Sequence, residues 1–291
     1  MCDETTNETH DLALAARRLT RREFAALGAA AALSACASNG NDRPGEQELV
    51  EETVRITTAD GIADAFFVHP AKGKWPGVIM WPDIAGLREA KRIMARRLAS
   101  AGHAVLVVNQ YYRSQPAPVM ESFSEFMDPE GRKRAMALYA TVTPDMVTRD
   151  AKAFVAFLDA KEAVDTKRGI GSNGYCMGGS FTVRTAAAMP DRVKAVASFH
   201  GGGLVGDKAD SPIKLLAATK ASYLIAISRD DDAKTPGEKD ALRKAADAAG
   251  RPTEIVVYPA DHGWCVPDLP VYDPTQADLA FEQMLGLFMG L

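Results

Sequence analysis

Short, almost entirely apolar runs alternate along this chain with longer amphipathic segments, and this alternation limits the possible folds more than any other feature. The runs at residues 78–81, 104–108 and 223–228 are apolar at nearly every position, as strands are when both faces of their sheet are buried. Strands that are linked through helices pair in parallel. The sequence therefore predicts an α/β fold with a mostly parallel central sheet and helices on both faces.

The expected elements follow one another with short links. Strands are expected over residues 54–58, 63–68, 78–81, 104–108, 169–172, 193–199, 223–228 and 254–258. Helices are expected over residues 87–101, 146–158, 177–188, 236–249 and 273–289. The first two strands form a hairpin with Asp60-Gly61 at its turn. No second core pattern appears, so residues 48–291 are predicted to form one domain.

Residues 116–143 interrupt this order as a polar, irregular insertion with helical patches. A long insertion of this kind is either a cap over a binding site or a surface excursion, and the sequence leaves both possibilities open. In open parallel sheets, ligands bind at the carboxyl ends of the strands. The residues that perform the function are therefore expected directly after the strands.

Residues 1–36 have the pattern of an export signal. The pair Arg21-Arg22 precedes an Ala/Leu-rich stretch at residues 24–35, which is too short to span a membrane as a helix. A twin-arginine pair followed by such a stretch is typical of proteins that cross the membrane already folded. The sequence thus predicts export by the twin-arginine route into the periplasm.

The end of this signal resembles a lipobox. Small residues stand before Cys36, which would become a lipidated N-terminus and a possible anchor to the membrane. Simple cleavage after Ala37 is the alternative. Residues 37–47 have the composition of a linker.

Composition excludes several classes of protein. The net charge is −4 and no cluster of basic residues follows position 22, so nucleic-acid binding is not expected. Four cysteines are too few for a disulfide scaffold. Cys265 lies close to His262, but further ligands at metal-binding spacing are missing, so neither a metal nor another cofactor is predicted.

The segment Gly174-Tyr175-Cys176-Met177-Gly178-Gly179 lies between an expected strand and an expected helix. The pattern G-x-C-x-G is that of a nucleophile elbow with sulfur in place of oxygen. Glycines flank the nucleophile because the turn is so tight that side chains there would collide with backbone. The start of a helix also favours a thiolate, so the pattern predicts that Cys176 is a nucleophile.

Two later loops supply the partners that such a nucleophile needs. The strand at residues 223–228 ends at Asp230-Asp231-Asp232, and the next strand leads to His262. Nucleophile, acid and histidine follow in this order in α/β-hydrolases. The imidazole would take the thiol proton, and an acid would orient the imidazole.

Over residues 50–290 the sequence resembles the dienelactone hydrolase family, on the elbow described above, on Asp232 with Pro236, and on His262-Gly263. Members of this family are α/β-hydrolases that open cyclic enol-lactones and other esters through a Cys-His-Asp triad. The resemblance implies that Cys176 is the nucleophile and His262 the base. It implies Asp232, four residues before Pro236, as the triad acid, with Asp231 as the alternative.

Two further segments fit the family, at residues 81–87 and 111–113. The resemblance implies that the backbone N–H groups of Ile84 and Met177 form the oxyanion hole. It assigns Asp83 to a proton relay and Arg113 to a substrate carboxylate, or to an ion pair with Asp83. Together with Tyr111, Trp264 is expected to line the substrate pocket, although Trp264 fits the core equally well.

Two positions depart from the best-known members, which carry Glu at the position of Asp83 and Arg at the position of Val266. The loss of that Arg predicts a weaker preference for anionic lactones. The expected function is carboxymethylenebutenolidase-like cleavage of small carboxylic esters or lactones through a thioester intermediate. The alternatives are a noncatalytic periplasmic binding lipoprotein on the same scaffold and a thiol redox protein that uses Cys176 with Cys265.

Overall fold

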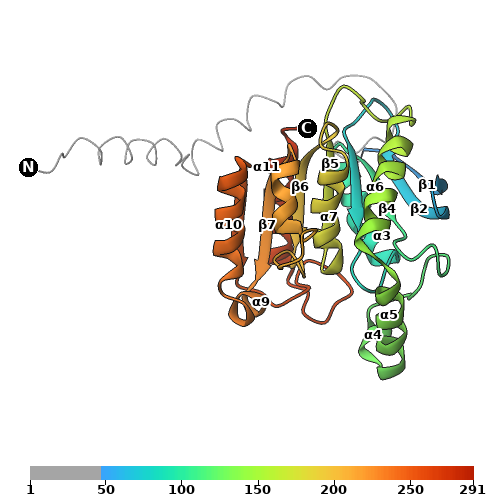
Figure 1. Cartoon of the computed structure of the whole chain (residues 1–291). Coiled ribbons are helices and arrows are strands. Elements are labelled where there is room, and N and C mark those ends of the chain that lie inside the picture. The colour runs from blue at the N-terminus through green and yellow to red at the C-terminus, as the bar shows by residue number, and fades with distance from the viewer. Residues whose placement is uncertain (1–46) are drawn as a thin grey trace, which may run out of the picture. The chain divides into compact units, whose positions relative to one another are not determined.

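A central sheet of eight strands, in the order β1-β2-β4-β3-β5-β6-β7-β8, organises the computed structural model, which describes residues 47–291 (Figure 1). The strands are β1 (Leu49–Thr58), β2 (Gly61–Pro70), β3 (Gly77–Trp81), β4 (Ala104–Val108), β5 (Ile170–Tyr175), β6 (Val193–Phe199), β7 (Ser222–Ser228) and β8 (Thr253–Tyr258). β1 and β2 form the expected antiparallel hairpin, and β2 pairs antiparallel with β4. All other neighbours are parallel, which confirms the predicted fold class.

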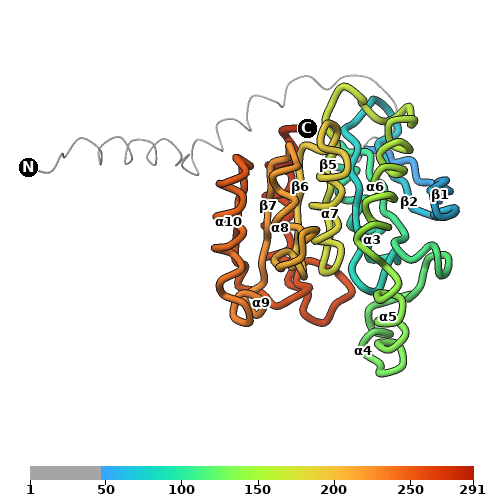
Figure 2. Tube along the Cα trace, in the orientation of Figure 1, coloured from blue at the N-terminus to red at the C-terminus, as the bar shows by residue number. Residues whose placement is uncertain are grey.

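Helices cover both faces of this sheet, as Figures 1 and 2 show. The longer ones are α3 (Glu89–Ser100), α5 (Pro129–Thr141), α6 (Pro144–Asp159), α7 (Met177–Ala188), α10 (Glu238–Ala249) and α11 (Pro274–Phe288). The shorter ones are α4 (Ser124–Met127), α8 (Pro212–Leu215), η1 (Leu216–Ala218) and α9 (Arg229–Lys234). No helix within residues 47–291 is long and apolar enough to cross a membrane.

Two separate apolar clusters fill the space between the sheet and its helices. One cluster joins the sheet to α6, α7 and α10, and the other joins it to α3 and α11. Every residue of β3 and β4 is buried. Burial of both sheet faces explains why these strands carry no polar alternation, and it leaves the carboxyl ends of the strands as the accessible edge.

One segment differs from the sequence prediction in a way that affects the site. Residues after β7 were predicted as a loop, but they form the short helix α9. Ser228 begins this helix as its N-cap, because the Ser228 hydroxyl accepts a hydrogen bond from the Asp231 N–H at 3.3 Å. The three consecutive aspartates therefore point in different directions around a helical turn.

The insertion at 116–143 contains the helices α4 and α5, which extend beyond the sheet at the end where α9 begins (Figure 1). Asp128 caps α5 by accepting the N–H groups of the first turn. At the base of the insertion, the Phe123 N–H donates to Asp268 Oδ2 at 2.9 Å. This bond ties the insertion to the segment that follows His262.

Candidate active site

Cys176 lies in a strained turn between β5 and α7. Its backbone has φ +54° and ψ −119°, a conformation that side chains other than glycine rarely adopt. A Cβ on Gly174 would lie 2.2 Å from the Gly178 carbonyl oxygen, and one on Gly178 would lie 2.4 Å from the Trp81 carbonyl oxygen. Both glycines are therefore required for steric reasons, and the turn presents a half-buried thiol at the carboxyl edge of the sheet.

His262 stands between an acid and this thiol. Its Nδ1 lies 2.6 Å from Asp231 Oδ2, and its backbone N–H donates to Asp230 Oδ1 at 2.8 Å. Burial opposes protonation, but hydrogen bonds to Asp231 and to Cys176 outweigh it and raise the pKa of His262 to about 10. Because Nδ1 is taken by Asp231, the other ring nitrogen is the one that remains for Cys176.

The carboxylate bound to His262 belongs to Asp231, so the prediction of Asp232 as the triad acid was wrong. The Asp232 carboxylate pairs instead with Lys239 Nζ at 2.7 Å. The physical reason is α9, since consecutive residues of a helix point about 100° apart and only one of them can face His262. Ser228 fixes this choice by donating its hydroxyl to Asp231 Oδ2 at 2.7 Å.

Two backbone amides near Cys176 are free to bind an oxyanion. Ile84 follows β3, and Met177 is the first residue of α7, where helical N–H groups lack a partner. Neither amide donates any of the hydrogen bonds found within residues 47–291. The structure is thus compatible with the oxyanion hole expected at these positions.

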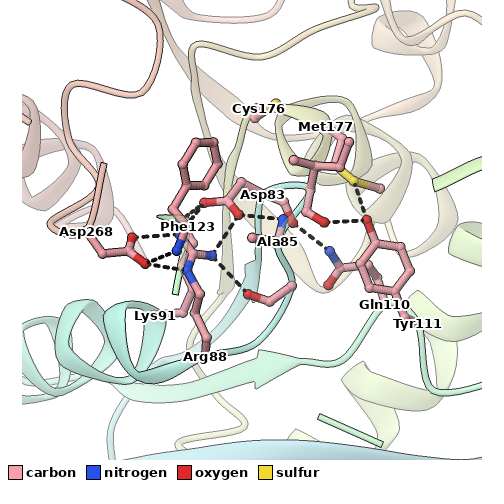
Figure 3. A network of polar contacts seen from close by, with 12 residues as sticks. Asp83, Ala85, Arg88, Lys91, Gln110, Tyr111, Phe123, Cys176, Met177 and Asp268 are labelled. Carbon is pink, nitrogen blue, oxygen red and sulfur yellow. Dashed lines mark hydrogen bonds and ion pairs between the residues drawn. The ribbon is translucent and has the colours of Figure 1, made fainter. Parts of the chain in front are cut away.

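Asp83 belongs to a set of charges that we call the buried charge cluster: the buried Asp83, Arg88 and Lys91 together with Asp268, whose side chain is 23% exposed (Figure 3). Arg88 Nη1 and Lys91 Nζ each lie 2.8 Å from the Asp83 carboxylate. Arg88 also binds Asp268 through two bonds of 2.7 Å. Burial alone would raise the pKa of Asp83, but the charges of Lys91 and Arg88 hold it far below its ordinary value.

This environment contradicts the proton-relay role expected of Asp83. A carboxylate that is bound by two cations and holds the Ala85 N–H at 3.0 Å is a poor acceptor for a thiol proton. The side chain has instead a structural role in the loop that carries Ile84. Sequence reasoning missed the partners Arg88 and Lys91, because charged residues at the start of a helix usually face solvent.

Arg113 is also engaged elsewhere. Its guanidinium lies 2.6 Å from Asp60 Oδ2 and 2.7 Å from Asp150 Oδ1. Neither carboxylate was predicted from the sequence as a partner of Arg113, and Asp83 is not among the partners of Arg113. The expected ion pair with Asp83 is therefore wrong, and the guanidinium is already neutralised before any substrate carboxylate could reach it.

Tyr111 and Trp264 lie on the core side of the site rather than on its solvent side. The Tyr111 hydroxyl donates to the Ile84 carbonyl oxygen at 2.9 Å and lies 3.2 Å from Met177 Sδ. Trp264 is fully buried, with its ring 5.3 Å from that of His200. Both side chains therefore support the site from within the core and do not line a substrate pocket.

His200, at the end of β6, is a site residue whose contacts were not expected. Its Nδ1 accepts a hydrogen bond from the Cys176 N–H at 3.1 Å, and its ring centroid lies 4.6 Å from that of His262. Burial and the neighbouring His262 charge keep the pKa of His200 well below its ordinary value. The position of His200 directly after a strand fits the expectation that site residues follow the strands, but this position predicts no bond to Cys176.

Cys265 forms no disulfide bond with Cys176. Cys176 and Cys265 are both free thiols. Cys265 is packed in the apolar cluster under α3 and α11, and burial raises its pKa to about 12. Across residues 47–291, no group of three His, Cys, Asp or Glu side chains is arranged to hold a metal ion.

Comparison with known proteins places this geometry in a family. The sequence profile of the dienelactone hydrolase family matches residues 63–290. A protein of Methylorubrum extorquens, provisionally named a carboxymethylenebutenolidase, is 28% identical over 82% of this chain and 81% of its own length. The carboxymethylenebutenolidase of Rhodococcus opacus is 29% identical over 66% of this chain and 71% of its own length.

A solved structure agrees with these relatives. A Klebsiella pneumoniae protein, provisionally named a dienelactone hydrolase, superposes with a TM-score of 0.72 at 25% identity, covering 84% of this chain and all of that one. The match to the family profile spans most of the described residues. The chain therefore belongs to the dienelactone hydrolase family and is an ester or lactone hydrolase with the α/β-hydrolase fold.

Proposed function

We propose that this chain hydrolyses small carboxylic esters or lactones through a triad of Cys176, His262 and Asp231. The observation that carries the proposal is the position of His262, which bonds the Asp231 carboxylate at 2.6 Å and has its pKa raised by bonds to Asp231 and to the Cys176 sulfur. An imidazole held between a carboxylate and a thiol is the arrangement that activates a cysteine nucleophile.

The reaction proceeds in two halves. His262 holds the proton that the thiol gives up, so Cys176 attacks the carbonyl carbon of the ester as a thiolate. The amides of Ile84 and Met177 hold the negative oxygen of the tetrahedral intermediate. The carbon–oxygen bond then breaks, and the leaving alkoxide takes the proton from His262. A water molecule, deprotonated by His262, attacks the thioester and releases the carboxylic acid and the thiol.

We further propose that neutral substrates are preferred to anionic lactones. Arg113 is bound by Asp60 and Asp150, and Arg88 by Asp83 and Asp268. Val266, where the best-known members carry Arg, is fully buried. A substrate carboxylate would thus have to displace a carboxylate from an existing ion pair. The free energy lost with that ion pair offsets the free energy gained from the new one.

Turnover of p-nitrophenyl acetate, with and without iodoacetamide, tests the catalytic proposal. The wild type is expected to turn over and to lose activity on alkylation, while Cys176→Ala is expected to be inactive. Mass spectrometry of the quenched reaction should show one acetyl group on Cys176. A noncatalytic binding lipoprotein would show no turnover, and a thiol redox protein would show a reducible bond between Cys176 and Cys265.

The export signal and the lipid on Cys36 fall outside the described residues. We propose that the protein is exported by the twin-arginine route and anchored in the periplasm through Cys36, on the sequence pattern alone. Fractionation of cells that express the full chain tests this. Arg21→Lys with Arg22→Lys should retain the protein in the cytoplasm, and Cys36→Ser should release the exported protein from the membrane fraction.

A further inference from the structure

The loop that carries the Ile84 amide is a tight turn from Asp83 to Gly86. The Asp83 carbonyl oxygen accepts the Gly86 N–H at 2.9 Å, which closes the turn. The same oxygen accepts a bond of 2.8 Å from the side-chain amide of Gln110, a buried residue two positions after β4. Two donors thus occupy both lone pairs of one backbone oxygen. Figure 3 shows the side chain of Gln110 directed toward the turn at Asp83.

The orientation of this carbonyl determines where the Ile84 N–H points. The peptide bond is planar and trans, so its C=O and N–H point in opposite directions. In the unit that joins Asp83 to Ile84, the oxygen is directed at Gln110, and the hydrogen therefore points away from Gln110. That hydrogen belongs to the Ile84 amide, which donates to no group within the described part of the chain.

The next peptide unit is held separately. The Ile84 carbonyl oxygen accepts the Tyr111 hydroxyl at 2.9 Å, and the Ala85 N–H donates to Asp83 Oδ1 at 3.0 Å. Type I and type II turns differ by a flip of this central peptide, so these two bonds select one of the two forms. Gln110 and Tyr111, adjacent in sequence, therefore fix two successive peptides of the turn.

We propose that Gln110 is a positioning residue for the oxyanion hole, which aims the Ile84 N–H by holding the carbonyl on the opposite side of the same peptide. This inference rests on the proposed ester hydrolysis. Gln110 touches no reacting atom in this mechanism. The effect of Gln110 on the Ile84 N–H passes through the rigid peptide plane. Because the amide of Gln110 is neutral, it adds no charge next to the buried charge cluster.

Replacement of Gln110 by Met keeps the length of the side chain and removes the donor. The tetrahedral oxyanion exists only in the transition state and the intermediate, so kcat should fall while KM changes little. Loss of an entire oxyanion-hole donor lowers kcat by about 10²–10³. Because the Gly86 bond remains, we expect a loss of roughly tenfold, and Gln110→His, which retains a donor, should recover part of it.

A reaction without a carbonyl oxyanion separates positioning from general damage. Alkylation of Cys176 by iodoacetamide proceeds by displacement of iodide and needs no oxyanion hole. The alkylation rate of Gln110→Met should therefore stay within about twofold of the wild type, while kcat for p-nitrophenyl acetate falls. Tyr223→Phe is the matched control, since it removes one buried hydrogen bond of 2.8 Å to Thr219 far from the turn.

The outcomes separate the two proposals. An inactive wild type refutes the ester hydrolysis and, with it, the role of Gln110. An active wild type with an equally active Gln110→Met refutes only the role of Gln110. Equal losses in kcat and in alkylation rate also overturn it, because they indicate damage to the nucleophile. Should Gln110→Met fold poorly, Gln110→Leu gives the same comparison.

Discussion

The two sides of Cys176 use charged residues in opposite ways. On one side, His262 and Asp231 have side chains that are 34% and 30% exposed. On the other side, Arg88 and Asp83 have side chains that are 0% and 3% exposed. Charged groups that remain partly open can exchange protons with substrate and water, whereas fully buried charges must be neutralised by partners.

The difference shows that burial, rather than residue type, determines whether a charged residue at this site takes part in proton transfer or stabilises the structure. Asp231 is bound closely by one hydroxyl and one imidazole, and the exposed Lys234 lies farther away at 3.5 Å, so its charge acts mainly on His262. Asp83 is bound by two cations and a backbone amide, so its charge is used to hold the loop of Ile84. In the proposed mechanism, carboxylates of the same kind thus serve as a triad acid and as a structural anchor.

The comparison is most sharply tested by the two neighbouring acids of α9. Asp231→Asn should lower kcat by about 10³–10⁴, because an amide no longer stabilises the protonated form of His262. Asp232→Asn should leave kcat within about twofold, since Asp232 only pairs with the partly exposed Lys239. Steady-state kinetics with p-nitrophenyl acetate measures both, and the reverse pattern would restore Asp232 as the acid.

Substitutions on the buried side are expected to lower the free energy of unfolding. Arg88→Met leaves Asp83 and Asp268 without their shared partner, and breaking a buried pair in this way costs about 3–5 kcal/mol of unfolding free energy. Arg96→Met is the control, because Arg96 pairs with Glu51 and Glu89 at the surface and should cost about 1 kcal/mol at most. Urea denaturation measures both, and equal costs would contradict the assigned difference in burial.

Stability should also depend on pH in opposite directions on the two sides. The pKa of His262 is raised from 6.5 to about 10, so its stabilisation is fully present below pH 6.5 and is lost as pH rises through about 10. The pKa of Asp83 is depressed below 3.8, so its stabilisation is present above that value and is lost only in acid.

Denaturation of the wild type and of His262→Gln between pH 6 and 10.5 tests the first of these directions. The difference in unfolding free energy should be largest near pH 6 and should shrink toward pH 10. A difference that grows with pH would mean that His262 is neutral in the resting protein. Groups that do not interact with His262 titrate equally in both proteins, so their contributions cancel in the difference.

The sequence predicted the exposed side of the site better than the buried side. Cys176 directly follows β5 within the glycines that an elbow requires, and His262 lies in the loop after β8 in the expected order, so their positions followed from local pattern. The choice between Asp231 and Asp232 failed because it depends on α9, whose start is set by the Ser228 cap. A shift of one residue on a helix turns the side chain away from His262.

The buried side could not be predicted from local pattern. The buried charge cluster joins α3 to Asp268, far apart in the sequence, and the bond from Gln110 to Asp83 depends on β4 lying beside β3. Such contacts are set by tertiary packing and leave no periodic signal. The same limit explains Arg113, whose partners Asp60 and Asp150 come from two separate parts of the chain.

Arg113 gives the smallest expected effect, and it tests whether the site lacks a free cation. Because its guanidinium is engaged by Asp60 and Asp150, Arg113→Met should change KM by less than about twofold for neutral p-nitrophenyl acetate and for an anionic lactone alike. Steady-state kinetics with both substrates measures this. A rise in KM of tenfold or more that is confined to the anionic lactone would show that substrate displaces the two aspartates. Arg113 would then act in binding, and the preference for neutral esters would have to be abandoned.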